Sequence, residues 1–367
     1  MTMGSELAAH WLRLTMVRGA GPVLGRKLVQ AAGSIETLWA TGAGQLSALD
    51  GVGPQLLMAL RQSTPDAVKT TLAYCQQHDI QLICPDDSVW PVSLQSIEDA
   101  PLVLFVRGDT ESLNHKRLLA IVGARKASRE GRLITRRWSR YFSDRGVAVV
   151  SGMAYGIDAA AHGGALEGLS PTLAVLGCGL GRLSEEQHSQ VAAVSRQGCV
   201  ISEFLPDVSA RPEFFPLRNR IIAALAQATL VMEADLRSGS LITARQAADY
   251  GKDVLAVPGS VLAGNHAGCH QLIRDGATLA ESAENVLQHM GWLAQSTAGK
   301  TYVPNSAEEA LILQLLERES MHVDALAETC GLTVPELSPI LLRFELQGVV
   351  ERLPGSRYLL AMELRDT

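Results

Sequence analysis

The chain has 367 residues, enough for two or three domains, and 47% of them are hydrophobic, which is ample for a buried core. No run of about 18 or more uncharged apolar residues occurs, and the N-terminus lacks the apolar segment of a signal peptide, so we expect neither a membrane span nor secretion. The six cysteines form no C-x-x-C pair and no Cys/His cluster, which predicts a protein of the reducing cytoplasm without disulfides or a metal site.

The net charge of −6 conceals a basic region and an acidic end. Residues 304–367 carry 5 Lys/Arg and 11 Asp/Glu, so the preceding part of the chain holds 27 of each sign and is neutral. Within that neutral part, residues 116–145 contain ten basic side chains and only two acidic ones, Glu130 and Asp144. The total charge argues against a nucleic-acid partner, but its distribution is compatible with one.

Residues 1–64 are predicted to form a small helical domain of the helix-hairpin-helix or SAM-like kind. Two segments, 16–30 and 46–60, share an apolar approach, a Gly-x-Gly-Pro turn and an amphipathic helix. Glycine amides at such a helix start can face a phosphate, which would mean DNA contact. The alternative is a helical turn that only packs on its neighbour. The basic side chains nearby are Arg26, Lys27 and Arg61.

Residues 65–290 alternate between short apolar runs and helical stretches, which predicts an α/β fold with a Rossmann-like, doubly wound parallel sheet. In such a sheet ligands bind beyond the carboxyl ends of the strands, where this sequence keeps its glycines and polar residues. The predicted strands are 118–124, 147–152, 172–179, 199–203, 229–234 and 253–259. The helices predicted between them are 129–145, 157–168, 185–197, 218–227 and 241–251.

Residues 291–305 have no periodicity and are predicted to be a linker. Residues 306–367 are predicted to be a winged helix, with three helices and a hairpin that turns at Pro354-Gly355. The third helix would be the recognition helix, but it carries more acidic than basic side chains, which is the wrong charge for reading a groove. We therefore expect protein contact or a structural role here. Pro339 is expected to shift the start of this helix or to kink it.

The loops after the first two predicted strands of this sheet have the composition of an anion site. A tight glycine turn with exposed amides, a forked arginine donor and a serine that caps the next helix can together hold phosphate oxygens. The candidates after the first strand are Gly123, Arg125, Lys126 and Ser128, and those after the second are Ser151, Gly152 and Gly156.

Asp158 and His162 lie one helical turn apart and invite a catalytic interpretation. No serine or cysteine nucleophile stands at a recognisable elbow, so we expect Asp158 to cap its helix and to hold His162 in place. The glycines at 177, 179 and 181 are too closely spaced for a dinucleotide loop, so no NAD and no other cofactor is expected. Glu233 ends a later strand, and the next helix opens with Ser238, Gly239, Ser240 and Thr243, as an anion site requires.

Several of these motifs occur together and in a fixed order. They are "AIVGARKAS", "VVSGMAYGIDAAAHGGAL", "VISEF", "FFPLRNRIIAAL", "VMEADLRSGSLITARQAADYGKDVLAVPGS" and "GCHQLIRDGA". The sequence resembles the DNA-processing protein DprA (Smf) family over nearly its whole length. The resemblance implies a cytoplasmic bacterial protein of natural transformation without established catalytic activity, which binds incoming single-stranded DNA, helps to load RecA onto it and forms a homodimer through the Rossmann-like domain.

The resemblance also implies a set of DNA-contacting residues. They are Gly123, Arg125, Lys126, Ser151, Gly152, Tyr155, Gly156, Arg218, Asn219, Arg220, Ser238, Gly239 and Ser240. Two positions depart from the family pattern. Tyr155 stands where the family generally has Arg or Lys, so a stacking contact would replace a phosphate contact. Ser184-Glu185 replaces a Tyr-Pro of the family after the third strand.

Arg218 and Arg220 raise a question of burial, because they stand between two phenylalanines and an apolar segment. On a helix they point in different directions, so we expect one to meet DNA and the other to pair with Glu203 or Glu233. The alternative is that both are structural. The phenylalanines are expected to pack against the sheet or a base.

A nucleotide-handling enzyme of the Rossmann-like phosphoribohydrolase type is the alternative function. Such enzymes carry P-G-G-x-G-T followed by a catalytic Glu, whereas residues 258–268 read "PGSVLAGNHAG" and lack both the glycine run and the acid. A protein-interaction scaffold built on the acidic C-terminal domain is a third interpretation, and it is compatible with DNA binding.

Overall fold

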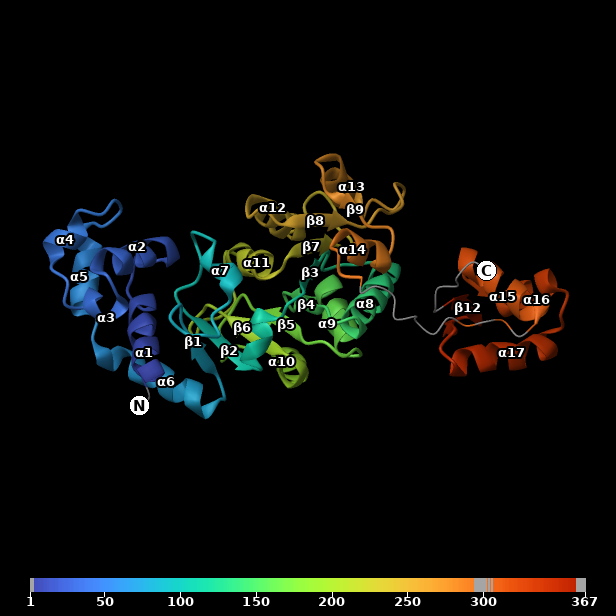
Figure 1. The fold of residues 1–367 in the computed structure, drawn as a ribbon, viewed down its shortest axis with the longest axis horizontal. Helices are drawn as coiled ribbons and strands as arrows, with labels where there is room; N and C mark the ends of the chain where they lie inside the picture. The colour runs from blue at the N-terminus through green and yellow to red at the C-terminus, as the bar shows by residue number, and fades with distance from the viewer. Residues whose placement is uncertain (1–2, 294–301, 303, 305, 361–367) are drawn as a thin grey trace. The chain divides into compact units, whose positions relative to one another are not determined.

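The computed structural model describes residues 3–293, 302, 304 and 306–360. The chain forms two compact units, Met1–Trp292 and Leu293–Thr367 (Figure 1). Most of the predicted linker, 291–305, lies outside the described residues.

A nine-stranded sheet organises the first unit, in the order β1-β2-β6-β5-β4-β3-β7-β8-β9. The strands from β6 to β9 in this order are parallel, and β2 and β1 extend the sheet in antiparallel pairing. The sheet is therefore mostly parallel, as predicted. Its strands are β1 (Gln81–Ile83), β2 (Leu104–Gly108), β3 (Leu118–Val122), β4 (Ala148–Ser151), β5 (Thr172–Val175), β6 (Cys199–Ser202), β7 (Ala228–Val231), β8 (Asp253–Ala256) and β9 (Thr278–Leu279).

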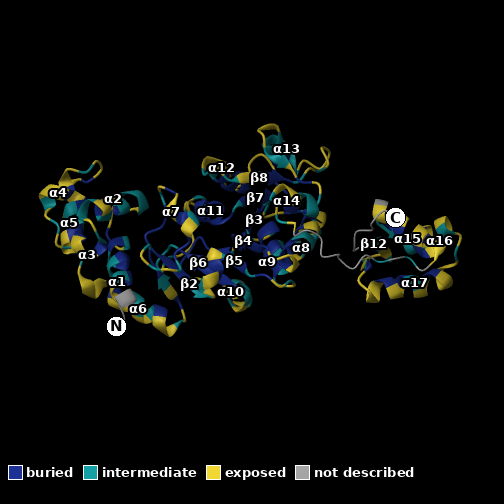
Figure 2. Cartoon of the chain, in the orientation of Figure 1, coloured by how far each residue is buried: buried dark blue, intermediate teal, exposed yellow. Residues whose placement is uncertain are grey.

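The strand order reverses at β3, which has β4 on one side and β7 on the other. This is the topological switch point, where ligands bind in open α/β sheets. The helices that follow and cover these strands are α8 (Arg129–Asp144), α9 (Ile157–Ala165), α10 (Glu185–Gln197), α11 (Phe214–Leu225), α12 (Ser240–Asp249), α13 (Ala267–Arg274) and α14 (Ala283–His289). The buried strands form the centre of this unit (Figure 2).

Both faces of the central strands are apolar because each face packs on its own helices. Leu119 and Ile121 of β3 lie in the core with Phe142 of α8, while Ala120 and Val122 lie in the core that contains α11 and α12 side chains. This alternation is the two-residue period of a strand buried on both faces. The helix predicted from residue 218 begins four residues earlier, at Phe214, since Pro216 fits in its first turn.

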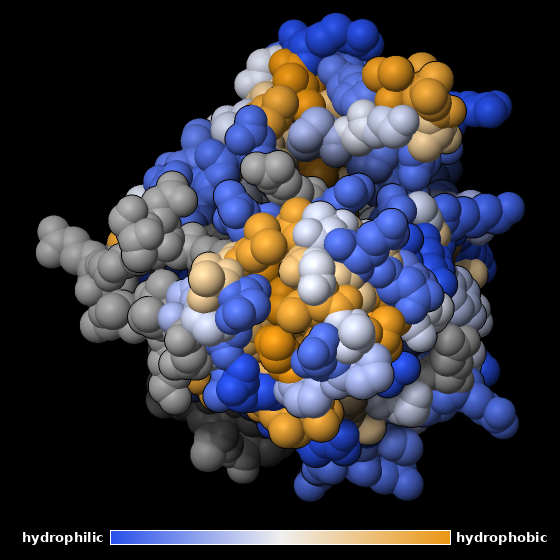
Figure 3. All heavy atoms as spheres, turned by 90° about the vertical axis from the view of Figure 1, so that its right-hand side faces the viewer, coloured by the Kyte–Doolittle hydropathy of each residue, from blue (hydrophilic) through white to orange (hydrophobic). Residues whose placement is uncertain are grey.

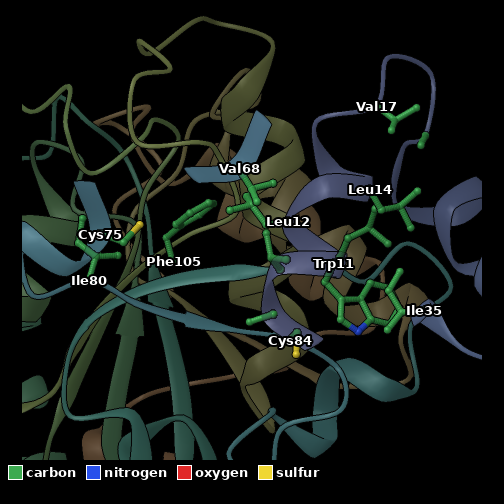
Figure 4. Close-up of a cluster of buried hydrophobic side chains, with 14 of the residues drawn as sticks. Trp11, Leu12, Leu14, Val17, Ile35, Val68, Cys75, Ile80, Cys84 and Phe105 are labelled. Atoms are coloured by element: carbon green, nitrogen blue, oxygen red, sulfur yellow. The ribbon is translucent and has the colours of Figure 1, made fainter. Parts of the chain in front are cut away.

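The N-terminal helices share their core with the edge of the sheet. Figure 4 shows Trp11 and Leu12 of α1 in one cluster with Phe105 of β2, and the same cluster includes Val194 of α10. The indole nitrogen of Trp11 donates to Asp86 Oδ2 at 2.6 Å. The buried core thus crosses the division predicted at residue 64. The helices are α1 (Met3–Thr15), α2 (Pro22–Ala32), α3 (Ile35–Leu38), α4 (Ala43–Ser47), α5 (Pro54–Gln62), the 3-10 turn Pro65–Val68, α6 (Lys69–Gln77) and α7 (Val92–Gln95).

The second unit has the helices and the hairpin predicted for a winged helix. Its elements are α15 (Ala307–Arg318), β10 (Met321–His322), α16 (Val323–Cys330), α17 (Val334–Leu346), β11 (Val350–Leu353) and β12 (Arg357–Leu360), with the small sheet in the order β10-β12-β11. Of the two effects expected of Pro339, a shifted start of the third helix and a kink, the shift is wrong and the kink stays a prediction. A capping box between Thr333 and Glu336 sets that start, and α17 continues through Pro339.

The third helix of this unit, α17, presents acidic and apolar side chains to solvent. Its one basic side chain, Arg343, pairs with Glu309, which is itself buried. Leu342 and Leu346 are exposed on the same helix. Figure 3 shows a face of the molecule on which hydrophobic residues lie open among hydrophilic ones. These features favour protein contact over groove reading.

The shared core predicts that the N-terminal helices and the sheet unfold together. Phe105→Ala should lower the free energy of unfolding of the first unit by about 3–5 kcal/mol, because it leaves a cavity in that core. All five tryptophans, at 11, 39, 90, 138 and 292, lie in this unit, so urea unfolding followed by tryptophan fluorescence measures it alone. Leu341→Ala, in the core of the second unit, is the matched control and should leave the fluorescence midpoint unchanged. An unchanged midpoint for Phe105→Ala would contradict the shared core.

Candidate nucleic-acid interface

Two adjoining cavities open beyond the carboxyl ends of the central strands. The first, here called the switch-point cavity, has a volume of about 460 Å³ and lies between the loops that follow β3 and β7. The second, the outer cavity, has a volume of about 230 Å³ and lies beyond β4 and β5. Arg125, Ala154 and Phe215 line both. The cavities are therefore joined at one wall, at the site that the strand order predicts.

The shared wall pairs a cation with an aromatic ring. The guanidinium carbon of Arg125 lies 4.6 Å from the centroid of the Phe215 ring, a cation–π contact that orients the side chain. Arg125 and its neighbour Lys126 are both exposed. Their charges are therefore available to an anion from solvent, in a position fixed by Phe215.

Glycines allow the loops after β3 and β4 to approach each other. A Cβ at Gly123 would lie 2.6 Å from the Ile157 side chain, and one at Gly156 would lie 2.3 Å from the Ala124 carbonyl oxygen. Gly156 also has a φ of +82°, which side chains rarely adopt. These glycines act by permitting close backbone contact, and Ile157 N donates to Ala124 O across it at 3.2 Å.

Arg218 is buried beneath the two cavities and bonds to the ends of two strands. Its Nη1 donates to the carbonyl oxygens of Gly152, at 2.5 Å, and of Val175, while its Nε donates to Asn219 Oδ1 at 3.0 Å. Burial lowers the pKa of Arg218 to about 10, and nearby Asp158 opposes that shift. The guanidinium is thus charged at neutral pH and fixes the loops that follow β4 and β5.

Arg220 lies on the other side of α11 and lines neither cavity. It is 3% exposed and pairs with Glu203 and, at 3.3 Å, with Asp99. The predicted pairing with Glu203 is present. Glu233 has a different role, since its two carboxylate oxygens accept from the amide and the hydroxyl of Ser128, the cap of α8. Of the two arginines, only Arg218 borders the site, and it is mostly covered.

The prediction that Asp158 caps its own helix and holds His162 is wrong. Asp158 Oδ2 accepts from the amides of Gly152 at 3.2 Å and Ala154 at 3.4 Å, so it stabilises the loop after β4. Burial raises its pKa, against the lowering effect of Arg218.

His162 bonds to the sheet instead. The Thr172 hydroxyl donates to Val149 O at 3.0 Å and therefore accepts from His162 Nδ1–H at 2.8 Å. Burial, with the charge of Arg218, lowers the pKa of His162 to about 3. The pair is not a catalytic dyad, because the histidine is neutral and its bonding nitrogen faces a structural threonine.

The serine loop before α12 borders the switch-point cavity, as predicted. Ser238 Oγ lies 2.8 Å from Ser240 Oγ, and Asn219 Nδ2 donates to Gly239 O at 3.5 Å. All four residues line that cavity. Their hydroxyls and the first amides of α12 provide neutral donors opposite the Arg125–Lys126 pair.

Tyr155 is 67% exposed and lines the outer cavity. Ser184, which caps α10, lies in the same lining with Gln187. The two positions at which the resemblance implies a departure from the family, Tyr155 and Ser184, therefore lie in this one cavity.

The structure brings together most of the predicted residues and leaves some out. Gly123, Arg125, Lys126, Gly152, Tyr155, Arg218, Asn219, Ser238, Gly239 and Ser240 line one or both cavities. Ser151 lines neither, since its buried hydroxyl donates to Ile121 O at 2.7 Å, and Gly156 acts through the backbone. The lining residues that the sequence did not single out include Met153, Gln187, Asp235, Arg237, Ile242 and Asn265. Arg237 could have been found, because it lies in the loop after a predicted strand.

Two negative findings apply to the described residues only. No cluster of three or more His, Cys, Asp or Glu side chains there could hold a metal ion. No helix in the same part of the chain has the length and apolarity to span a bilayer.

Residues 81–291, which contain the sheet and both cavities, match the family model of DNA recombination-mediator protein A, and residues 295–356 match that of the DprA winged helix domain. The chain belongs to the DprA (Smf) family. Protein Smf of Escherichia coli (strain K12) is 37% identical to it over 303 residues, which cover 79% of this chain and 80% of the relative.

Solved structures of the family agree with the fold. An X-ray structure of DprA from Streptococcus pneumoniae aligns with a TM-score of 0.67 at 30% identity and covers 76% of this chain and 97% of the other. A structure that addresses the single-stranded DNA binding mode of DprA from Helicobacter pylori aligns with a TM-score of 0.52 at 26% identity, over 57% of this chain and 95% of the other. Both DprA structures thus share the fold of more than half of this chain.

The buried histidine predicts a pH effect on stability. The pKa of His162 is about 3 in the folded protein and about 6.5 when unfolded, so between these values the unfolded chain binds the additional proton. Stability should therefore fall as pH falls through this window, by up to about 1.4 kcal/mol per pH unit. His162→Asn keeps a donor to Thr172 and removes the titration. Urea unfolding between neutral pH and the acid end of this window should show wild type losing stability relative to His162→Asn, and a constant difference would contradict the neutral, buried histidine.

Proposed function

We propose that this protein binds single-stranded DNA in the two joined cavities, during natural transformation. The observation that supports this most is the Arg125–Phe215 pair at the switch point, in a family whose Helicobacter pylori member has a described single-stranded DNA binding mode. Arg125 and Lys126 provide phosphate contacts, and the serine loop provides neutral donors. Tyr155 and Phe215 offer ring surface to bases.

Single strands fit this site better than duplexes. Bases in a duplex are stacked and cannot reach aromatic rings inside a cavity, whereas unpaired bases can turn toward them. Phosphate donors line the switch-point cavity and Tyr155 lines the outer cavity, and Arg125 and Phe215 line both, so one strand can use both cavities. Duplex DNA would meet only the exposed charges.

The buried carboxylates at the site have structural partners, which supports binding more than catalysis. Both oxygens of Glu233 accept from Ser128, and Asp158 accepts from two backbone amides. Neither arrangement leaves a carboxylate directed at a bound ligand as a general base. Binding of nucleoside monophosphates without oligonucleotide binding would instead favour the phosphoribohydrolase-type enzyme.

The finer parts of the proposal concern partners and location. We place the protein in the cytoplasm as a homodimer that helps to load RecA onto the bound strand. The six unpaired cysteines are compatible with a reducing compartment. Light scattering tests the dimer, and RecA filament formation on protein-coated single strands tests loading; a monomer, or no gain in filament formation, would contradict these parts.

Removal of the charge of Arg125, which lines both cavities, is the first test of DNA binding. Arg125→Ala should weaken binding of labelled oligothymidylate about tenfold or more and lower the slope of log affinity against log salt by about 0.7. Fluorescence anisotropy over a salt series measures both. Arg196→Ala is the matched control, since Arg196 is exposed in the last turn of α10 and lines neither cavity, whereas the lining residues of that helix lie in its first turns. Equal effects of the two variants would contradict a site at Arg125.

Variants at Tyr155 distinguish base stacking from phosphate contact in the outer cavity. Tyr155→Ala should cost about 1–3 kcal/mol of binding free energy with little change in salt slope, because a stacked base is lost. Tyr155→Lys should steepen the salt slope by about 0.7, because it adds a phosphate contact. The same anisotropy series measures both variants. No change in either would mean that the strand does not enter the outer cavity.

A further inference from the structure

The outer face of α8 carries a row of arginines that the two cavities do not use. Arg129, Arg132, Arg136 and Arg140 are exposed and follow each other at intervals of three or four residues, which places them along one stripe. The opposite side of the helix, including Thr135 and Phe142, is buried. We call these four residues the α8 stripe.

Neighbouring acids neutralise only part of the α8 stripe. Arg136 pairs with Glu167, and Arg140 Nε lies 3.8 Å from Asp144 Oδ2. Among the described residues no carboxylate oxygen lies within 4.0 Å of Arg129 or Arg132. Arg132 Nη1 donates to the Ala127 carbonyl oxygen, but this bond leaves the charge of Arg132 without a carboxylate partner. Like charges one turn apart destabilise a helix, so helix stability does not explain two unpaired cations at Arg129 and Arg132.

The stripe begins at the mouth of the switch-point cavity. Arg125 and Lys126 line that cavity, and α8 starts three residues later, after its cap at Ser128. The exposed cations thus form a continuous row from the cavity along the helix. From Arg129 to Arg140 the stripe extends over 11 residue steps, about 17 Å of helix, which is long enough to contact several successive phosphates.

The residues around the α8 stripe favour a flexible polyanion over a membrane or a protein as its partner. Membrane insertion would require the apolar side of α8, which is buried in the core of the sheet. A protein interface would require apolar anchors, and Ile134, at 39% exposed, is the one large apolar side chain that the described part of α8 exposes. A flexible polyanion requires neither, since regularly spaced cations suffice for it.

We propose that the α8 stripe is a backbone track for single-stranded DNA that leaves the switch-point cavity. The proposal rests on DNA binding in the cavities and extends the site to a second surface. Phosphates beyond those held at Arg125 and Lys126 contact Arg129 and Arg132 first. The cavities hold a short segment, and the track adds affinity only for longer strands.

Arg129→Gln/Arg132→Gln tests the track, with anisotropy on oligothymidylates of about four and about sixteen nucleotides, the range of known single-strand site sizes. The double variant should bind the short strand as wild type does, lose about fivefold or more on the long strand, and show a salt slope lower by up to about 1.4 on the long strand alone. Arg196→Gln/Arg274→Gln is the matched control and should change neither. All four side chains are exposed, so circular dichroism should show no loss of fold.

Each other outcome overturns the track. An unchanged salt slope and affinity on the long strand would show that DNA does not follow α8. Equal losses on both lengths would place the two arginines in the cavity site. Wild type that binds neither strand would remove the proposed function together with the track, and wild type that binds only the short strand would remove the track alone. Loss of pelleting with anionic phospholipid vesicles, with long-strand binding intact, would assign the stripe to membranes.

Discussion

The buried guanidinium of Arg218 is the interaction on which the candidate site depends. It bonds to the carbonyl oxygens of Gly152 and Val175, at the ends of β4 and β5, and Asp158 balances its charge from the other side of the same loop. Removing one member of such a buried group leaves an unpaired charge or unbonded carbonyls. The network fixes the loop after β4. This loop carries Tyr155 and forms one wall of the outer cavity, so both depend on the network.

The network explains why a conspicuously basic motif contributes so little exposed charge. Of the two arginines in the motif, Arg218 holds the strand ends and Arg220 holds Glu203 and Asp99. The cations that solvent can reach come from the loop after β3, where Arg125 and Lys126 precede α8. The motif thus builds the floor of the cavity, and the next loop provides the charge at its opening.

Much of the fold could be predicted from the sequence because it depends on local pattern. The apolar runs at 118–124 and 253–259 contain β3 and β8, and α10 has the predicted bounds, set by the cap at Ser184. An ion pair between one arginine of α11 and a glutamate at a strand end could also be expected, and Arg220 pairs with Glu203, which directly follows β6. What could not be predicted depends on packing between distant segments, such as the core that joins Trp11 to Phe105.

The same limit applies to the site. Spacing alone put Asp158 and His162 on one helical face, but burial and bonding partners decided their roles. His162 bonds to Thr172 on β5, and Asp158 bonds to amides that precede its helix. Likewise, the position of Phe215 under Arg125 requires α11 and the loop after β3 to meet, which no short-range pattern encodes.

Photocrosslinking of a thymidine-analogue oligonucleotide, with peptide mapping by mass spectrometry, tests the central claim most directly. A strand bound in the joined cavities should crosslink to Tyr155 and Phe215, the two rings in their lining. Excess unlabelled single strand should abolish these crosslinks and duplex DNA should not. Crosslinks confined to the N-terminal helices or to the second unit would contradict the claim that DNA binds at the strand ends of the sheet.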